Sequence, residues 1–255
     1  MKKTSLLLIC AIMLSIFKIN ASANSNELHW YVKRREGHLP PIAERNMDFL
    51  SEYDSYYLDN NAAEKNEKVM YLTFDAGYEN GNIKTILDIL KDEGIPAAFF
   101  VLSHLVESNT DLIMRMQNEG HLVCNHSASH KDMTKLSRDD FQNELQKMEE
   151  IVMRHTGKAI DHYFRPPKGY FNEENLKWAQ ELGYKTVFWS LCYADWDNQK
   201  QPSTAYAVKL LLDNTHPGAI ILLHPTSATN VSILPTLIAK WRKEGYTFAS
   251  IDQIL

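Results

Sequence analysis

The alternation of strand-like and helix-like segments from residue 69 onward constrains the fold of this 255-residue chain most strongly. Short apolar runs rich in β-branched and aromatic residues predict strands, and the longer segments between them have helical periodicity. Such alternation predicts an α/β fold whose strands pair in parallel through right-handed crossovers. The predicted strands are residues 69–74, 97–101, 122–125, 163–165, 185–190, 219–223 and 246–250. The predicted helices are residues 83–93, 111–119, 138–156, 172–182, 204–214 and 232–244.

An open doubly wound sheet and a barrel both satisfy this alternation. No Gly-x-Gly-x-x-Gly follows the first strand, which argues against a dinucleotide-binding sheet. The first strand is apolar at nearly every residue, as expected when both of its faces are covered. The positions of the reactive residues must therefore decide between the two architectures.

The first 23 residues have the pattern of a signal peptide. Lys2 and Lys3 precede an apolar run over residues 6–17, and an Ala-Ser-Ala cleavage pattern follows at 21–23. We expect cleavage after Ala23 and export across the membrane, with an uncleaved membrane anchor as the alternative. No later segment is apolar enough to span a membrane, so the mature protein is expected to be soluble.

The net charge limits the kinds of binding partner, and the cysteines limit the possible disulfides. Removal of residues 1–23 takes away three lysines and no acids, so the net charge changes from −5 to −8. An acidic chain has no electrostatic reason to bind nucleic acid or anionic lipid, and we expect a neutral or locally recognised partner and a monomer. Cys124 and Cys192 are interpreted as free, buried side chains, because so long a chain needs no disulfide to stabilise its core. No Cys-x-x-Cys motif is present, which argues against a structural zinc site or a thioredoxin-like centre.

Residues 24–68 precede the regular pattern and are polar and aromatic. We expect an irregular N-terminal extension packed on the main domain of residues 69–255 through Trp30, Tyr56 and Tyr57. A flexible wall spacer is the alternative, but the aromatic residues between positions 30 and 57 are many for a disordered linker.

Reactive side chains follow five of the seven predicted strands. They are Asp75, His126, Arg165, Asp195 and His224, with His130 four residues after His126 and Trp196 beside Asp195. Each has a plain structural reading as a helix cap, an ion-pair partner or a core residue. Together they gather at the carboxyl ends of the strands, where a barrel of alternating strands and helices carries its active site.

The ordered set of motifs resembles the polysaccharide deacetylases of carbohydrate esterase family 4, also called NodB-like. The matching pieces are Thr-Phe-Asp at 73–75, His-Ser-x-x-His at 126–130, Arg-Pro-Pro-x-Gly at 165–169, Asp-Trp at 195–196 and Leu-His at 223–224. The resemblance covers residue 69 to the C-terminus. It implies a distorted barrel of about seven parallel strands and a hydrolase that removes N-acetyl groups from amino sugars.

The resemblance also implies a role for each matching residue. Asp75 is similar to the general base that deprotonates the attacking water, with Arg165 holding it in place and ionised. His126 and His130 are similar to ligands of a divalent metal such as zinc, which polarises the amide carbonyl and lowers the pKa of bound water. His224 resembles the acid that protonates the departing amine.

Four further residues complete the implied site. Asp195 would orient His224 and favour its protonated form. The backbone N–H of Lys168 would help to bind the oxyanion, and Gly169 would ease its close approach. Trp196 would wall a small pocket for the acetyl methyl group.

One position departs from the family pattern. The family usually has a second aspartate directly after the base as a third metal ligand, and here that position is Ala76. Catalytic zinc sites usually have three protein ligands. The metal therefore binds weakly, is completed by water or substrate, or is dispensable.

The segment Gly-Tyr-Glu-Asn-Gly at 77–81 resembles the branch of the family that makes muramic δ-lactam in spore peptidoglycan. The resemblance implies N-acetylmuramic acid in a glycan strand as the substrate. One alternative is a deacetylase of N-acetylglucosamine in peptidoglycan or chitooligosaccharide. Another is a carbohydrate-binding pseudoenzyme that lost its metal along with the aspartate.

Overall fold

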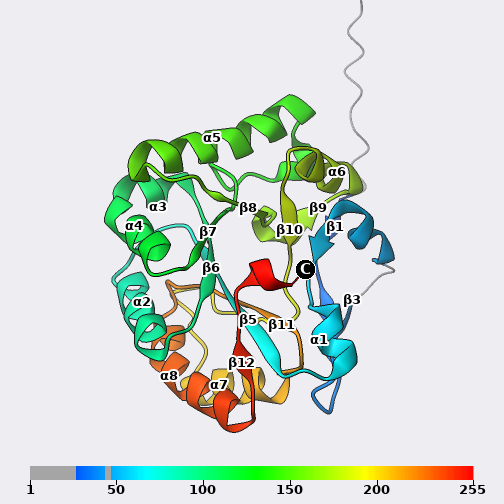
Figure 1. Ribbon diagram of the computed structural model, residues 1–255, viewed down its shortest axis with the longest axis vertical. Coiled ribbons are helices and arrows are strands. Elements are labelled where there is room, and N and C mark those ends of the chain that lie inside the picture. Colours follow the sequence, from blue (N-terminus) through cyan, green and yellow to red (C-terminus); the bar gives the residue numbers. More distant parts are fainter. Residues whose placement is uncertain (1–26, 44–46, 255) are drawn as a thin grey trace, which may run out of the picture.

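A parallel sheet forms the centre of the computed structural model, which describes residues 27–43 and 47–254. Its eight strands follow the order β11-β5-β6-β7-β8-β10-β4, and β12 pairs with the beginning of β5 (Figure 1). The strands are β4 (Ser55–Tyr56), β5 (Val69–Ala76), β6 (Ala97–Val101), β7 (Leu122–Asn125), β8 (Asp161–Phe164), β10 (Lys185–Val187), β11 (Ala219–Leu223) and β12 (Thr247–Phe248). The seven predicted strands are all present.

Helices surround this sheet in Figure 1. The longer ones begin and end within a few residues of their predicted bounds, whereas the two short helices α1 and α3 were missed. The helices are α1 (Asn60–Lys65), α2 (Asn82–Glu93), α3 (Ser103–Ser108), α4 (Thr110–Asn118), α5 (Arg138–Thr156), α6 (Glu173–Glu181), α7 (Thr204–Asp213) and α8 (Ala228–Lys243). A short helix contains too few turns for a clear apolar period, which explains the omissions.

The two ends of the sheet are joined by irregular chain after β10. The backbone N–H groups of Ser190 and Leu191 donate to the carbonyl of Ile220 at 2.9 and 3.2 Å, and Leu222 N–H donates back to Leu191 at 2.9 Å. The strand β10 therefore ends at residue 187, earlier than the predicted 190, because the chain leaves it to reach β11. This closure makes the sheet a distorted barrel and confirms that architecture.

Apolar side chains cover both faces of the sheet. On β5, Leu72 and Phe74 belong to the large cluster between the sheet and the outer helices. Tyr71, the residue before Leu72, joins the interior cluster with Phe100 and Ile251, which follows β12. Since side chains alternate between the faces of a strand, coverage of both faces explains why β5 has no polar alternation.

The N-terminal extension packs on the barrel and supplies part of it. Trp30 lies in an apolar cluster with Phe171 and Phe188, and its indole N–H donates to the carbonyl of Trp189 at 2.9 Å. Tyr57 packs against this cluster, while Tyr56 lies in β4, which pairs with β10. The prediction of an irregular segment is therefore wrong for β4 and α1. The predicted signal peptide lies outside the described residues.

Four short strands and four 3-10 helices complete the described chain. In small antiparallel pairs β1 (Leu28–His29) joins β9 (Tyr170–Phe171), and β2 (Val32–Lys33) joins β3 (Ile42–Ala43). The 3-10 helices are η1 (Asp48–Tyr53), η2 (Met133–Lys135), η3 (Pro167–Gly169) and η4 (Ile251–Gln253). The β1–β9 pair attaches the extension to the segment that follows β8.

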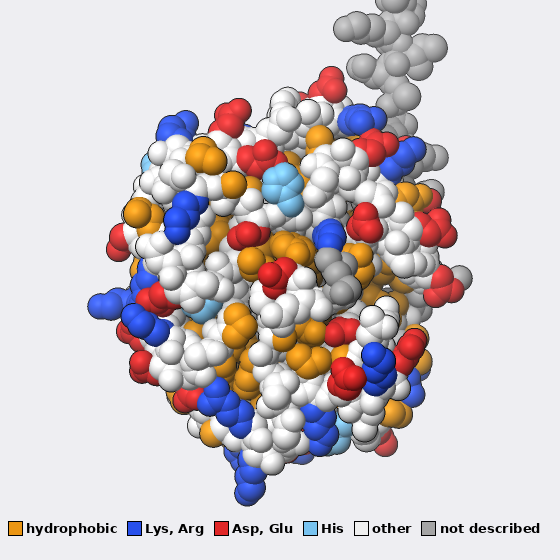
Figure 2. Space-filling model, viewed as in Figure 1, with side chains coloured by type: hydrophobic (Ala, Val, Ile, Leu, Met, Phe, Trp, Pro, Cys, Tyr) orange, Lys and Arg blue, Asp and Glu red, His pale blue; other side chains and the backbone are white. Residues whose placement is uncertain are grey.

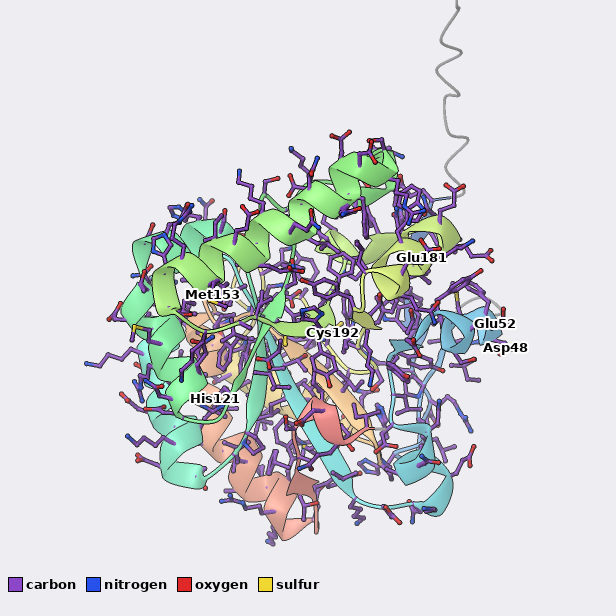
Figure 3. All side chains as sticks on the ribbon, turned by 45° about the horizontal axis from the view of Figure 1, so that its top comes forward. Asp48, Glu52, His121, Met153, Glu181 and Cys192 are labelled. Carbon is purple, nitrogen blue, oxygen red and sulfur yellow. The ribbon has the colours of Figure 1, made fainter. Side chains whose placement is uncertain are left out.

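Charged and apolar side chains are distributed as expected for a folded domain. In Figure 3, Asp48 and Glu52 lie at the outer edge, on η1, and both are exposed. Acidic and basic side chains are interspersed over the face seen in Figure 2. Both described cysteines are free; Cys124 is buried, but Cys192 is only partly so, which corrects the prediction. No helix among the described residues is long and apolar enough to cross a membrane.

Candidate active site

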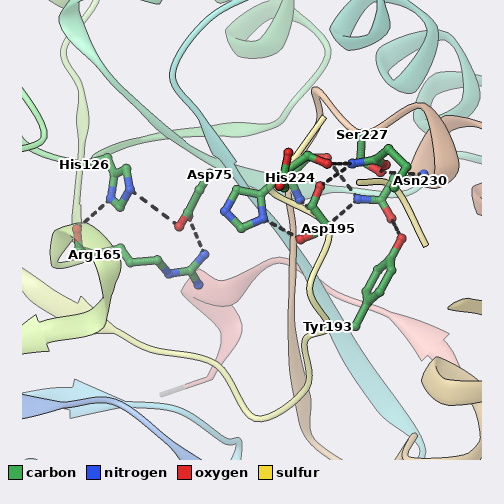
Figure 4. A network of polar contacts seen from close by, with 10 residues as sticks. Asp75, His126, Arg165, Tyr193, Asp195, His224, Ser227 and Asn230 are labelled. Atoms are coloured by element: carbon green, nitrogen blue, oxygen red, sulfur yellow. Dashed lines mark hydrogen bonds and ion pairs between the residues drawn. The ribbon is translucent and has the colours of Figure 1, made fainter. Parts of the chain in front are cut away.

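The predicted reactive residues meet at one end of the barrel, as Figure 4 shows. Asp75 is the penultimate residue of β5, while His126, Arg165 and His224 directly follow β7, β8 and β11. Asp195 lies in the irregular chain after β10. Two details differ from the prediction, since Asp75 lies within its strand and Arg165 lies just outside its own. The convergence itself is confirmed.

Asp75 is held by a buried guanidinium. Arg165 is fully buried and its Nη1 donates to Asp75 Oδ1 at 2.9 Å. The other donors of Arg165 are also used, since Nη2 reaches Thr73 Oγ1 at 2.9 Å and Nε reaches the Val187 carbonyl at 2.8 Å. The guanidinium lies 4.1 Å from the centre of the Phe100 ring. These contacts hold the Arg165 guanidinium in one orientation, which in turn fixes the orientation of the Asp75 carboxylate.

The pKa of Asp75 reflects two opposed effects. Burial favours the neutral acid, but electrostatic interactions with His126, Arg165 and His224 act in the opposite direction, and the pKa is lowered from its usual value. Arg165 is the permanent charge among the three. Asp75 is therefore a carboxylate at neutral pH, with 11% of its side chain exposed.

On one side of Asp75 lie two neutral imidazoles. His126 bonds through Nδ1 to the Arg165 carbonyl at 2.8 Å, so that nitrogen carries the proton and Nε2 is left as an acceptor. Its Nε2 lies 3.5 Å from Asp75 Oδ2. Burial lowers the pKa of His126, and burial together with the neighbouring His126 lowers the pKa of His130 to about 4. The two rings meet edge to face, with centroids 5.0 Å apart.

These two imidazoles fit a metal only in part. Each is neutral and has the state a metal ligand needs, and a bond from the second ring nitrogen to a carbonyl is the usual support of a metal-binding histidine. Ala76, however, offers no side-chain ligand. Across the described part of the chain, no group of three or more His, Cys, Asp and Glu side chains could hold a metal ion.

The other side of Asp75 carries a histidine with a carboxylate partner. His224 Nδ1 lies 2.7 Å from Asp195 Oδ1, and the backbone N–H of His224 donates to Asp195 Oδ2 at 2.8 Å. Burial opposes the charged form of His224, but the hydrogen bond and charge of Asp195 outweigh it, so its pKa is raised. Asp195 itself is fully buried.

The remaining predicted residues lie at the rim of the site. The Trp196 ring stands edge to face with His224 at 6.2 Å and remains 62% exposed, so it borders the site without enclosing it. Lys168 and Gly169 both have positive φ, 60° and 69°. A side chain at Gly169 would place its Cβ 2.9 Å from the Trp189 ring and 3.0 Å from Trp30 Cβ. Glycine is therefore required for this turn to pack against the extension.

The loop that carries the two histidines is shaped by residues whose role the sequence reasoning missed. Ser127 and His130 both have positive φ, 66° and 56°. The side-chain amide oxygen Oδ1 of Asn125 accepts from the Ser127 N–H, and Ser127 Oγ accepts from the His130 N–H, each at 2.9 Å. These bonds compensate a strained backbone and aim His130 towards His126.

Glu144 on α5 also holds the loop that carries His126 and His130. Its carboxylate accepts from the Ser129 N–H at 3.0 Å and from the Ser129 hydroxyl at 2.8 Å, and it pairs with Lys131 at 3.1 Å. Burial opposes ionisation of Glu144, but the bonds from Ser129 and Lys131 lower its pKa. The only sequence signal was an acidic residue on an otherwise apolar stripe of a helix, which is too weak to identify it.

Comparisons with known proteins agree with this geometry. The family model for polysaccharide deacetylases matches residues 62–187. Peptidoglycan-N-acetylmuramic acid deacetylase PdaA of Bacillus subtilis is 42% identical over 247 residues, 96% of this chain and 92% of that protein. A peptidoglycan-N-acetylglucosamine deacetylase of Bacillus cereus is 34% identical over 193 residues, 74% of this chain and 69% of that protein.

A solved structure extends the agreement from sequence to fold. The structure of Bacillus subtilis PdaA, a family 4 carbohydrate esterase, matches with a TM-score of 0.85 and 43% identity, and covers 90% of this chain and 97% of that one. The barrel, the ordered motifs and near full-length relatives point to one family. This chain belongs to the polysaccharide deacetylases, the carbohydrate esterases of family 4.

Proposed function

We propose that this chain hydrolyses the N-acetyl group of N-acetylmuramic acid in peptidoglycan. The observation that carries the proposal is a pair of groups at one end of the barrel, a carboxylate that can accept a proton and an imidazole that can donate one. Asp75 is kept ionised by Arg165, and His224 has its pKa raised by Asp195. Hydrolysis of an amide requires a base for the attacking water and an acid for the leaving amine.

Asp75 is the proposed base. Its carboxylate takes a proton from water as the water oxygen forms a bond to the acetyl carbonyl carbon. Arg165 bonds to Oδ1, which leaves Oδ2 available for this proton. In this role Arg165 positions the base and does not contact the substrate.

His224 is the proposed acid. Its Nδ1 is bonded to Asp195, so Nε2 is the nitrogen that delivers a proton to the sugar nitrogen as the carbon–nitrogen bond breaks. The products are acetic acid, which then ionises in water, and a free amine, and the proton count of the step balances because Asp75 has gained the proton that His224 has lost. Lys168 N–H and the turn at Gly169 are proposed to stabilise the oxyanion. Trp196 is proposed to border the acetyl methyl group.

We propose that His126 and His130 are the protein ligands of a divalent metal, which when bound polarises the acetyl carbonyl. The tautomer of His126 and the neutral state of both imidazoles support this assignment. Because Ala76 supplies no third side chain, the affinity for metal is expected to be lower than in a three-ligand site.

N-acetylmuramic acid is proposed as the substrate because the Bacillus subtilis relative named for it aligns over 96% of this chain. Deacetylation frees an amine beside the lactyl carboxyl group, which can close as the δ-lactam of spore cortex. This location requires export, and residues 1–23 are proposed as its signal peptide. Residues 24–68 are proposed as an extension of the catalytic domain, 69–255, in a monomer.

Peptide-free glycan strands provide the direct test. The mature chain is incubated with them, with and without added metal, and the digested products are analysed by mass spectrometry. Loss of 42 Da, an acetyl group replaced by hydrogen, is expected on muramic acid residues. Asp75→Asn is expected to reduce turnover by about 10³-fold or more while the folded chain remains intact.

Two other outcomes would replace the proposal. Deacetylated glucosamine without deacetylated muramic acid would assign the activity of the Bacillus cereus relative instead. No turnover by the wild-type chain on either sugar, with retained binding of the glycan, would indicate a carbohydrate-binding pseudoenzyme.

A further inference from the structure

A buried asparagine supports Asp195 from the side opposite His224. Asn230 lies in the first turn of α8 and is 1% exposed. Its Nδ2 donates to Asp195 Oδ2 at 2.6 Å and to the backbone carbonyl of His224 at 2.9 Å. The Asp195 carboxylate therefore accepts three N–H bonds, two from His224 and one from this amide (Figure 4).

The orientation of the Asn230 amide is defined by its other end. Tyr193 donates its hydroxyl proton to Asn230 Oδ1, so the amide oxygen faces the tyrosine and the amide nitrogen faces Asp195. Burial raises the pKa of Tyr193, which keeps that hydroxyl a donor. A flipped amide would place its oxygen against two acceptors, Asp195 Oδ2 and the His224 carbonyl.

The backbone around Asn230 is fixed as well. Ser227 is the N-cap of α8, and its Oγ accepts from the Asn230 N–H at 3.1 Å. The same hydroxyl donates to Gln201 Oε1, in the irregular chain that carries Asp195. The start of α8 is thus bonded to the segment whose carboxylate it supports.

We propose that Asn230 is a positioning residue for the acid of this enzyme, an inference that rests on the proposed function. It acts through Asp195 and the His224 backbone, and touches neither the glycan nor the reacting atoms. Its amide holds one carboxylate oxygen while the imidazole of His224 bonds the other, so the imidazole keeps its direction when it gains and loses a proton.

The charged and titratable groups around this amide are few. Asp195 and Tyr193 contact it through their side chains, and His224 contacts it through its backbone carbonyl. Asp75 and Arg165 act on His224 from across the site. A carboxylic acid in place of the amide would therefore face Asp195 as its nearest charged neighbour.

Asn230→Asp tests the proposal because its effect depends on pH. At about pH 5 the new acid shares a proton with Asp195, since two adjacent carboxyl groups raise one pKa, and it still donates a bond. At about pH 8 both are ionised and repel. The ratio of wild-type to variant kcat is expected to rise about tenfold or more over this range, with KM little changed. Asn230→Leu, which cannot donate at any pH, is expected to lose kcat by a similar factor throughout.

Asn175→Asp is the matched control, because Asn175 is also buried in the first turn of a helix but lies away from Asp195. Its kcat profile should keep the wild-type shape. A loss for Asn230→Asp that is the same at every pH, or no loss for either Asn230 variant, would reduce Asn230 to a structural residue of α8.

An NMR titration of the His224 ring in the full mature chain separates this inference from the proposed function. An ionised carboxyl at position 230 adds negative charge near the ring, so Asn230→Asp is expected to raise the pKa of His224 above its wild-type value. An unchanged titration contradicts the positioning role even when the wild type has no turnover. Absent turnover with a shifted titration contradicts only the proposed function.

Discussion

The two sides of Asp75 carry the same kind of side chain in opposite electrical states. His126 and His224 are both largely buried, and each is bonded through Nδ1 at a similar distance, 2.8 and 2.7 Å. Burial lowers the pKa of His126, whereas the bond and charge of Asp195 outweigh burial and raise the pKa of His224. The partner of Nδ1 is a backbone carbonyl on one side and a carboxylate on the other.

This difference shows how one residue type supplies two functions at one site. A hydrogen bond to a carbonyl fixes the tautomer of an imidazole, but it does not compensate the free energy lost when a charged ring is removed from water. A buried carboxylate does, because its full negative charge acts in a medium of low polarity. The carbonyl-bonded ring is suited to bind a cation through its free nitrogen, and the carboxylate-bonded ring is suited to donate a proton.

Among changes confined to one side of Asp75, Asp195→Asn should have the largest effect, because it makes the environment of His224 resemble that of His126. The pKa of His224 is expected to fall, the alkaline limb of the kcat profile to move to lower pH, and kcat to drop by about 10²–10³-fold. Asp213→Asn removes an exposed carboxylate on α7 and is the matched control. An unchanged alkaline limb would contradict the role given to Asp195.

His130→Gln should come next, because it removes one of the two neutral imidazoles. With limiting metal, kcat/KM is expected to fall by about 100-fold and to recover partly when metal is added in excess. Metal content by mass spectrometry and the effect of a chelator on the wild type complete the measurement. His104→Gln, on the exposed face of α3, controls for loss of a histidine elsewhere. Wild-type activity that survives complete removal of metal would show that the imidazoles serve another purpose.

The pH profile of the wild type should be bell-shaped and wide. Asp75 must be ionised, and its lowered pKa places the acid limb below the usual aspartate value of about 3.9. His224 must be protonated, and its raised pKa places the alkaline limb above about 6.5. Asp75→Asn tests this assignment. If the residual activity of this variant lost the alkaline limb and kept the acid limb, the two limbs would be assigned to the wrong residues and the comparison would fail.

The imidazolium of His224, bonded to Asp195, also stabilises the fold. That stability is complete below about pH 6.5 and is lost as the pH rises through the folded-state pKa.

Glu144→Gln should have the smallest effect, because Glu144 contacts the histidine loop only through Ser129 and Lys131. An amide keeps one acceptor and loses the charge, so unfolding should become easier by about 1–2 kcal/mol. The affinity for metal is expected to fall several-fold while the pKa of His224 stays unchanged. Thermal unfolding and NMR titration measure the two quantities. A shift at His224 would mean that the two sides of the site are not independent.

Much of the site was encoded locally and could be predicted from the sequence. The strands β6, β7 and β11 and the helix α5 have the predicted bounds, because the hydrophobic period is a property of neighbouring residues. Placement of Asp75 and His224 at the carboxyl ends of strands followed from that period and from parallel pairing. Glu144 and Asn230 escaped prediction because a polar residue on a helix has many ordinary explanations.

The sequence by itself determined the order of strands and helices and which side chains stand at the strand ends, since both depend on short-range periodicity. Only the tertiary structure decided that the sheet closes between Leu191 and Ile221 and that residues 55–56 add an eighth strand. It alone decided the opposite pKa directions of His126 and His224. The reason is physical: closure, burial and the partner of an imidazole arise from contacts between residues that are distant in the chain.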